Sequence, residues 1–118
     1  MILKIDMASE VPIYQQVRDE IISLIGIGDL LQGDELPTVR SLAEDLGINP
    51  MTIQKSYNIL KNEGFIEIHR RVGARVSTLN NLKEESFEES FKKNILEAKA
   101  RGYNIEELIK KVQKWYLI

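Results

Sequence analysis

The sequence contains no cysteine and only one histidine, His69, among its 118 residues. A chain without thiols is typical of the reducing cytoplasm, which is where we expect this protein. Because His69 has neither a cysteine nor a second histidine with which to share a metal ion, we interpret it as a strand-end or phosphate-adjacent side chain. Neither a metal nor any other cofactor is therefore predicted.

Long apolar runs are also missing. The longest, Ile21 to Gly28, includes a serine and two glycines, and the N-terminal MILKIDMASE has no apolar core. We therefore expect neither a signal peptide nor a membrane span. The sequence also lacks a nucleophile-plus-base set and a glycine-rich phosphate loop, and its carboxylates are scattered over predicted helix surfaces. The chain is predicted not to be an enzyme.

Basic and acidic residues nearly balance, with a net charge of −2, but they are unevenly distributed. Residues 1–37 contain 2 basic and 7 acidic side chains, whereas residues 38–77 contain 6 basic and 4 acidic ones. Residues 78–118 contain 8 basic and 7 acidic side chains. Positive charge thus gathers in the middle of the chain, where we expect a surface for a polyanion such as DNA.

This middle segment, residues 36–77, reads LPTVRSLAEDLGINPMTIQKSYNILKNEGFIEIHRRVGARVS and contains two helical patterns. We expect the first helix to run from a hydroxyl cap at Thr38 to Gly47. The second is expected over residues 50–63, with Asn49 as its cap and a proline at its first position. Two helices joined by a turn of about four residues predict a helix-turn-helix.

The second helix divides into two faces when successive residues are placed 100° apart. The residues expected to face the core are Ile53, Ser56, Tyr57 and Leu60. The outward-facing residues are Met51, Lys55, Asn58 and Asn62, flanked by Thr52 and Gln54. Amides, a hydroxyl and a cation are the groups that bind base edges and phosphates in the major groove. A merely solvated polar face is the alternative, but the two-helix arrangement favours a DNA-reading helix.

A β-hairpin is predicted after the second helix, with strands over residues 65–68 and 75–78. The connecting residues 69–74 concentrate positive charge beside a glycine, which is typical of a wing that approaches phosphates or enters the minor groove. The residues expected to contact DNA there are Arg70, Arg71 and Gly73.

The motif is carried by three stretches: PIYQQVRDEI (12–21), GDLLQGDELPTVRSLAEDLGI (28–48) and NPMTIQKSYNILKNEGFI (49–66). In this combination the chain resembles GntR-type bacterial transcription regulators, and more narrowly their small YtrA-type branch. The resemblance implies DNA-contacting roles for Thr38 and Arg40, which match the hydroxyl and arginine of the family's LPSxR pattern. It also assigns such roles to Thr52, Gln54, Lys55 and Gly73.

Two residues depart from the family pattern. Arg71 stands where the wing usually has its first glycine, so we expect a less tight and more electrostatic tip. Gln54 stands where many larger relatives carry arginine, so their operator preferences do not transfer. The complete predicted DNA-binding set is Thr38, Arg40, Met51, Thr52, Gln54, Lys55, Asn58, Arg70, Arg71 and Gly73.

The flanking segments are predicted to complete two parts. Residues 1–11 should form an extended arm, and a helix opening at Pro12 should pack behind the reading pair, which gives a winged domain over residues 1–77. A membrane-surface role for this helix is disfavoured because its polar side carries Asp19 and Glu20 and little basic charge.

Residues 78–118 should contain two amphipathic helices, the second with a capping box formed by Asn104 and Glu107. A disordered tail and packing on the chain's own winged domain are the alternatives. Such helices have little within one chain to bury their apolar stripes against, and small relatives of the YtrA type dimerise through a short C-terminal helical segment. The predicted dimer contacts are Phe87, Phe91, Leu108, Val112, Trp115 and Tyr116.

The predicted fold is therefore mainly α with a small β-hairpin, a winged helix-turn-helix domain followed by a two-helix dimerisation segment. We expect a homodimeric transcription regulator, a repressor, that binds palindromic double-stranded DNA. A winged-helix protein-interaction module is the alternative function. The 41 residues after the wing cannot hold the effector-binding domain of larger relatives. A cleft at the dimer interface for a small-molecule effector stays open as an alternative, although no residue pattern indicates one.

Overall fold

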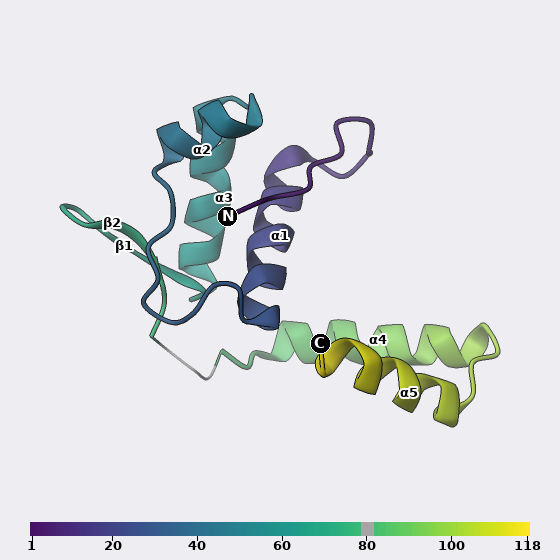
Figure 1. Ribbon diagram of the computed structural model, residues 1–118. Coiled ribbons are helices and arrows are strands. Elements are labelled where there is room, and N and C mark those ends of the chain that lie inside the picture. Colours follow the sequence, from purple (N-terminus) through teal and green to yellow (C-terminus); the bar gives the residue numbers. More distant parts are fainter. Residues whose placement is uncertain (79–81) are drawn as a thin grey trace. The chain divides into compact units, whose positions relative to one another are not determined.

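A computed structural model of the chain describes residues 1–78 and 82–118 (Figure 1). Residues 79–81, at the expected junction, lie outside the described residues. The chain forms two compact units, Met1–Leu82 and Lys83–Ile118. Their elements confirm a mainly α fold with one small hairpin and are, in order, α1 (Ile13–Ile27), α2 (Val39–Leu46), α3 (Pro50–Asn62), β1 (Ile66–His69), β2 (Gly73–Val76), α4 (Glu85–Ala100) and α5 (Ile105–Tyr116).

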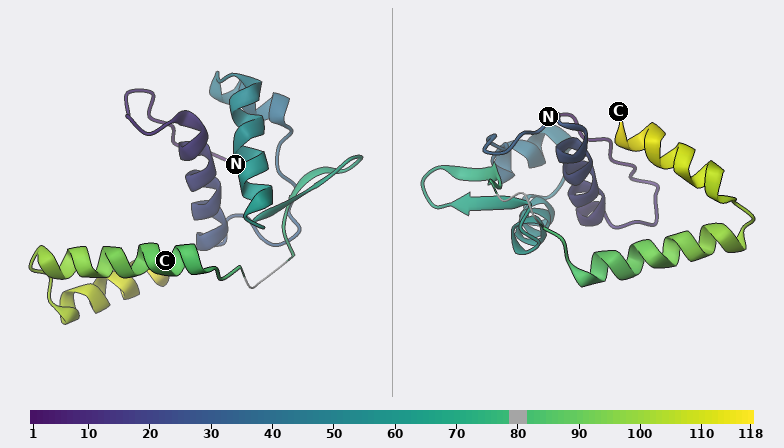
Figure 2. Two further views of the ribbon diagram at one scale, coloured as in Figure 1. Left: turned by 180° about the vertical axis from the view of Figure 1, so that it is seen from behind. Right: turned by 90° about the horizontal axis from the view of Figure 1, so that it is seen from below.

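The first unit is organised around α3. This helix packs against α1, α2 and β1, and Figures 1 and 2 show α1 running alongside it while the hairpin projects away from the helices. The predicted inner face of α3 is confirmed, because Ile53, Ser56, Tyr57 and Leu60 are all buried. The surrounding elements complete the core with Val17, Ile21, Leu36, Leu42, Ala43, Ile66, Ala74 and Val76.

The predicted caps set the turn between α2 and α3. The Thr38 hydroxyl accepts a hydrogen bond from the backbone N–H of Ser41 at 3.0 Å, and the Asn49 side chain accepts one from Met51 N–H at 2.8 Å. Gly47 has φ of 66°, a conformation that strains any residue with a Cβ atom. These local interactions end one helix and start the next within residues 47–49, which fixes the direction in which α3 leaves the turn.

The hairpin differs from the prediction in its second strand. That strand was expected from Arg75, but it begins at Gly73, which pairs with His69, so the connecting tip shrinks to residues 70–72. Gly73 makes the early start feasible by adopting φ of 86°. Ala74 then packs into the core at 9% exposure, and this burial favours the earlier start of the strand.

A third segment, residues 33–36, pairs with the other edge of β2. Gly33 N–H donates to the Val76 carbonyl, Val76 N–H to the Asp34 carbonyl, and Leu36 N–H to the Ala74 carbonyl, each at 2.9 Å. The chain before α2 therefore anchors the wing to the helix-turn-helix, a contact that the sequence analysis did not anticipate.

The N-terminal arm is held on α1. Leu3 is buried in the core, and the backbone N–H groups of Lys4 and Asp6 donate to the side chains of Glu20 and Gln16 at 2.6 and 2.8 Å. The arm is therefore a structural part of the winged unit, with α1 supplying the acceptors for its backbone.

The second unit consists of α4 and α5, which diverge from the turn that joins them (Figure 2). The predicted capping box is present, because the Asn104 side chain accepts from Glu107 N–H at 2.9 Å and the Glu107 carboxylate accepts from Asn104 N–H. None of residues 83–118 is buried. Between the two helices runs an apolar groove of about 450 Å³, lined mainly by Phe91, Ile95, Ala98, Ile105, Leu108, Ile109, Val112 and Trp115.

Candidate nucleic-acid interface

The outward side of α3 carries a strip formed by Met51, Gln54 and Asn58, which we call the reading strip. All three residues are exposed, and Met51 is 79% exposed. The Gln54 side-chain amide nitrogen donates to the Asn58 side-chain oxygen at 3.0 Å, so the two amides act as a pair. Because the opposite side of α3 is buried, the rotation of the helix is fixed and the strip faces away from the core.

Lys55 is exposed, as its predicted place on the outward face of α3 requires, and it also contacts α1. Its ammonium stands 3.8 Å from the centroid of the Tyr14 ring on α1, within the range of a cation–π interaction. The charge is therefore held at the α1 side of the reading strip. Tyr14 was expected only as part of the apolar face of α1, because sequence periodicity gives no information on which residue of another helix lies opposite it.

The residues at the start of α2 stand at the edge of the helix-turn-helix. Arg40 has an 88% exposed side chain, and its Nε atom lies 3.6 Å from a carboxylate oxygen of Glu44, one turn later in α2. Thr38 is exposed, although its hydroxyl already serves as the α2 cap. Thr52 is partly buried, and its carbonyl accepts from the buried Ser56 hydroxyl at 3.2 Å. Arg40 is thus the exposed cation at this edge of the helix-turn-helix.

The wing tip carries Arg70 and Arg71, both exposed, which are followed by Val72 and Gly73. The third arginine of the hairpin, Arg75, has partners within the protein: it donates to the Glu35 carboxylate at 2.8 Å and to the Gly33 carbonyl at 3.2 Å. His69 lies at the end of β1 with its Nε2 atom 3.3 Å from the Glu67 carboxylate. The charge available at the wing is therefore that of its three-residue tip.

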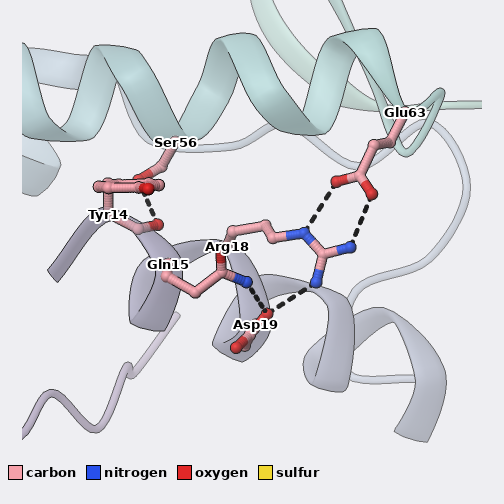
Figure 3. A network of polar contacts seen from close by, with 6 residues as sticks. All are labelled: Tyr14, Gln15, Arg18, Asp19, Ser56 and Glu63. Atoms are coloured by element: carbon pink, nitrogen blue, oxygen red, sulfur yellow. Dashed lines mark hydrogen bonds and ion pairs between the residues drawn. The ribbon is translucent and has the colours of Figure 1, made fainter. Parts of the chain in front are cut away.

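A polar network behind α3 holds it against α1 (Figure 3). The Arg18 guanidinium donates to both Glu63 carboxylate oxygens at 2.8 and 2.7 Å, and to Asp19 at 2.7 Å. The hydrogen bonds to Glu63 raise the pKa of Arg18 above its usual value. In the middle of α3, the Ser56 hydroxyl donates to the Tyr14 carbonyl at 2.8 Å.

The same helix is also tied to the chain before α2. The Tyr57 hydroxyl donates to the Pro37 carbonyl at 2.7 Å, and burial raises the pKa of this hydroxyl above its usual value. Sequence reasoning missed these partners because each joins residues that are far apart along the chain. The sequence offered two weak signals of these contacts. One was the hydroxyl of Ser56 on the inner face of α3, where apolar residues are expected, and the other was the carboxylate of Glu63 at the end of the same helix.

Other kinds of site find no support in the described part of the chain. Among residues 1–78 and 82–118, no cluster of three His, Cys, Asp or Glu side chains is placed to hold a metal ion. Over the same residues, no helix has both the length and the apolar character of a membrane span.

These elements define a winged helix-turn-helix. A capped helix comes first, a helix with an exposed face that bears amides comes second, and a basic hairpin follows. This fold and site belong to a DNA-binding transcription regulator. The sequence pattern described as "Bacterial regulatory proteins, gntR family" matches residues 13–76. The chain belongs to this family, which confirms the resemblance seen in the sequence, and members of the family are transcription regulators.

Individual relatives support this assignment. The HTH-type transcriptional repressor YtrA of Bacillus subtilis (strain 168) is 36% identical over 111 residues, which cover 90% of this chain and 85% of that protein. The structure of YtrA from Sulfolobus acidocaldarius, a GntR-family transcription factor, has a TM-score of 0.69 at 40% identity, covering 85% of this chain and 99% of that one. The DNA-binding domain of AraR in complex with operator ORX1 has a TM-score of 0.59 at 27% identity, covering 65% and 99%.

We predict that Glu63→Gln destabilises the winged unit more than Glu44→Gln does. Glu63 accepts two hydrogen bonds from Arg18 with side chains 28% and 24% exposed, whereas Glu44 meets Arg40 with side chains 72% and 88% exposed. Loss of the Arg18–Glu63 pair should lower the free energy of unfolding by about 1 kcal/mol, and loss of the exposed Arg40–Glu44 pair should lower it by less than about 0.5 kcal/mol. Urea unfolding monitored by circular dichroism measures both losses; equal losses would show that the Arg18–Glu63 pair contributes no more to stability than the exposed Arg40–Glu44 pair.

Proposed function

We propose that the protein is a homodimeric repressor that binds a palindromic DNA operator, with α3 in the major groove and the basic hairpin tip on the flanking DNA. The observation that carries this proposal is the reading strip, whose polar groups are exposed on a helix held by the core on its other side. A rigid helix of this kind can present the same groups to base edges each time it binds. The repressor YtrA and the operator complex of AraR are consistent with this role.

Each predicted contact has a distinct part in the proposal. Met51, Gln54 and Asn58 face the bases, while Thr52 and Lys55 stand at the margins of the groove. Arg40 and Thr38 contact the backbone beside the turn, and Arg70 and Arg71 contact it at the wing, where Gly73 lets the chain turn closely. A protein-interaction module would leave the exposed arginines of these separate elements without a common ligand.

The homodimer is proposed from the surface of α4 and α5. Apolar side chains gather on these helices without being buried: Phe87 is 65% exposed, Val112 56% and Trp115 59%. Phe87 and Phe91 stack with centroids 6.2 Å apart and rings within 10° of parallel, which makes a flat apolar surface. Such a surface in water is unfavourable by about 25 cal/mol for each Å², so covering it stabilises an assembly.

A second copy is the occupant that suits this surface. The contact would be formed by Phe87, Phe91, Leu108, Val112, Trp115 and Tyr116 of each copy, and it would place two winged units about one axis. Two α3 helices related in this way read two half-sites in opposite directions, and this explains why the operator should be an inverted repeat. One winged unit alone makes too small an interface for strong specificity.

The proposed function is tested by selecting bound sequences from a random duplex pool with the full chain at roughly physiological salt. We expect an inverted repeat to be enriched, because two copies of α3 read the same bases on opposite strands. Enrichment of single, unrepeated sites would contradict the dimeric part of the proposal. Enrichment of no sequence would contradict sequence-specific binding and favour the protein-interaction module.

We predict that Arg71→Ala weakens operator binding and lowers the slope of log affinity against log salt by about one unit, because one phosphate contact is lost. The loss should be similar on all sequences, since phosphates carry no sequence information. Arg101→Ala serves as the control, because that exposed arginine lies in the second unit and pairs with Glu97 at 2.9 Å. Fluorescence anisotropy over a salt series measures the slope; an unchanged slope would remove Arg71 from the phosphate contacts.

We predict that Val112→Glu converts the dimer to a monomer, because it places a charge in the middle of the α5 apolar face. Val72→Glu is a matched control: Val72 is 51% exposed on the wing tip and Val112 56% exposed on α5. Light scattering at micromolar concentration should give the mass of two chains for the wild type and for Val72→Glu, and that of one chain for Val112→Glu. A monomeric wild type would refute the homodimer.

A further inference from the structure

The reading strip is unusual in lacking a cation. The helix contains two lysines, and neither stands on the strip: Lys61 is in the last turn, and Lys55 is held 3.8 Å above the Tyr14 ring. Guanine presents two acceptors, N7 and O6, in the major groove, and arginine or lysine is the usual partner for them. A strip without a cation is therefore poorly suited to guanine.

The amide pair formed by Gln54 and Asn58 is suited to adenine instead of guanine. When the Gln54 nitrogen donates to the Asn58 oxygen, the oxygen of Gln54 and the nitrogen of Asn58 are the two amide atoms that this hydrogen bond leaves unoccupied. They offer one acceptor and one donor. Adenine presents one donor, its N6 amino group, and one acceptor, N7, at the same edge, so the two sets are complementary.

Met51 adds an apolar contact to the same strip. It lies three residues before Gln54, which at 1.5 Å per residue corresponds to about 4.5 Å along the helix axis, close to the spacing of neighbouring base pairs. The C5-methyl group of thymine is the apolar group of the major-groove edge. A side chain that is 79% exposed in the free protein would be covered by such a contact.

We propose that the reading strip recognises A·T pairs in each half-site, with Gln54 and Asn58 binding the edge of an adenine and Met51 contacting the methyl group of a thymine in a neighbouring pair. Lys55, which is held by its contact with the Tyr14 ring, contacts the DNA backbone and not a base. This assignment rests on the proposed placement of α3 in the major groove, and it specifies the chemical groups that the helix reads.

The experiment uses the full chain and a duplex obtained by the selection described above. Each thymine of one half-site is replaced in turn by uracil, which removes only the methyl group, and each adenine by 7-deazaadenine, which removes only the N7 acceptor. Dissociation constants are measured at one salt concentration for the wild type, Met51→Ala, Gln54→Ala, Asn58→Ala and Lys55→Ala. The altered residues are exposed, so the variants should keep the fold.

For the wild type, one uracil substitution should weaken binding about threefold to fourfold, the effect of one buried methyl group. One 7-deazaadenine substitution should weaken it roughly tenfold. Met51→Ala should abolish the uracil effect alone, and Asn58→Ala the 7-deazaadenine effect alone. Gln54→Ala should relax the preference for adenine at the same position. Lys55→Ala should weaken binding to every duplex while leaving both effects in place.

Three results would overturn the assignment, and they can be told apart. Tight binding of an inverted repeat that is insensitive to every uracil and 7-deazaadenine substitution would refute recognition of A·T pairs and leave the proposed function standing. Loss of a guanine preference in Lys55→Ala would likewise refute it, because Lys55 would then be a base reader. Failure of the wild type to enrich any duplex would refute the proposed function and this assignment together.

Discussion

The contact between α1 and α3 is the constraint on which the rest of the structure depends. Burial of Ile53 and Leu60 fixes which side of α3 faces inward, but apolar contacts alone allow a helix to slide or rotate slightly. The hydrogen bond from Ser56 to α1 and the two hydrogen bonds from Arg18 to Glu63 remove that freedom at two points along the helix. Directional polar contacts are therefore what make the exposed side of α3 a defined surface.

Ion pairs within the protein determine which of its basic residues stay exposed. Several basic residues are neutralised within the protein, such as Arg18 by Glu63 and Arg75 by Glu35, and these serve the fold. The exposed arginines at the start of α2 and at the wing tip remain for an external anion. A chain with a net charge of −2 is thus compatible with DNA binding, because the partition of its charges between internal pairs and exposed sites matters more than their sum.

The sequence predicted those features that depend on local rules. Helical periodicity identified both faces of α3, and cap residues such as Thr38 and Asn49 located the ends of the helices. The second strand was placed two residues too late because its start depends on pairing with residues 33–36, which no local pattern reveals. The position of Lys55 over Tyr14 and the docking of Leu3 are tertiary contacts of the same kind. The stripes of α4 and α5 predicted two helices, but a stripe does not identify what covers it.

Hydrogen bonding on both edges of β2 divides the hairpin into a part that is fixed and a part that is free to vary. Its base is continuous with the segment before α2 and with the core through Ala74 and Val76. Its tip is three exposed residues that contribute little to folding. In evolutionary terms, descendants of this protein could exchange the three residues of the tip while inheriting the same frame unchanged.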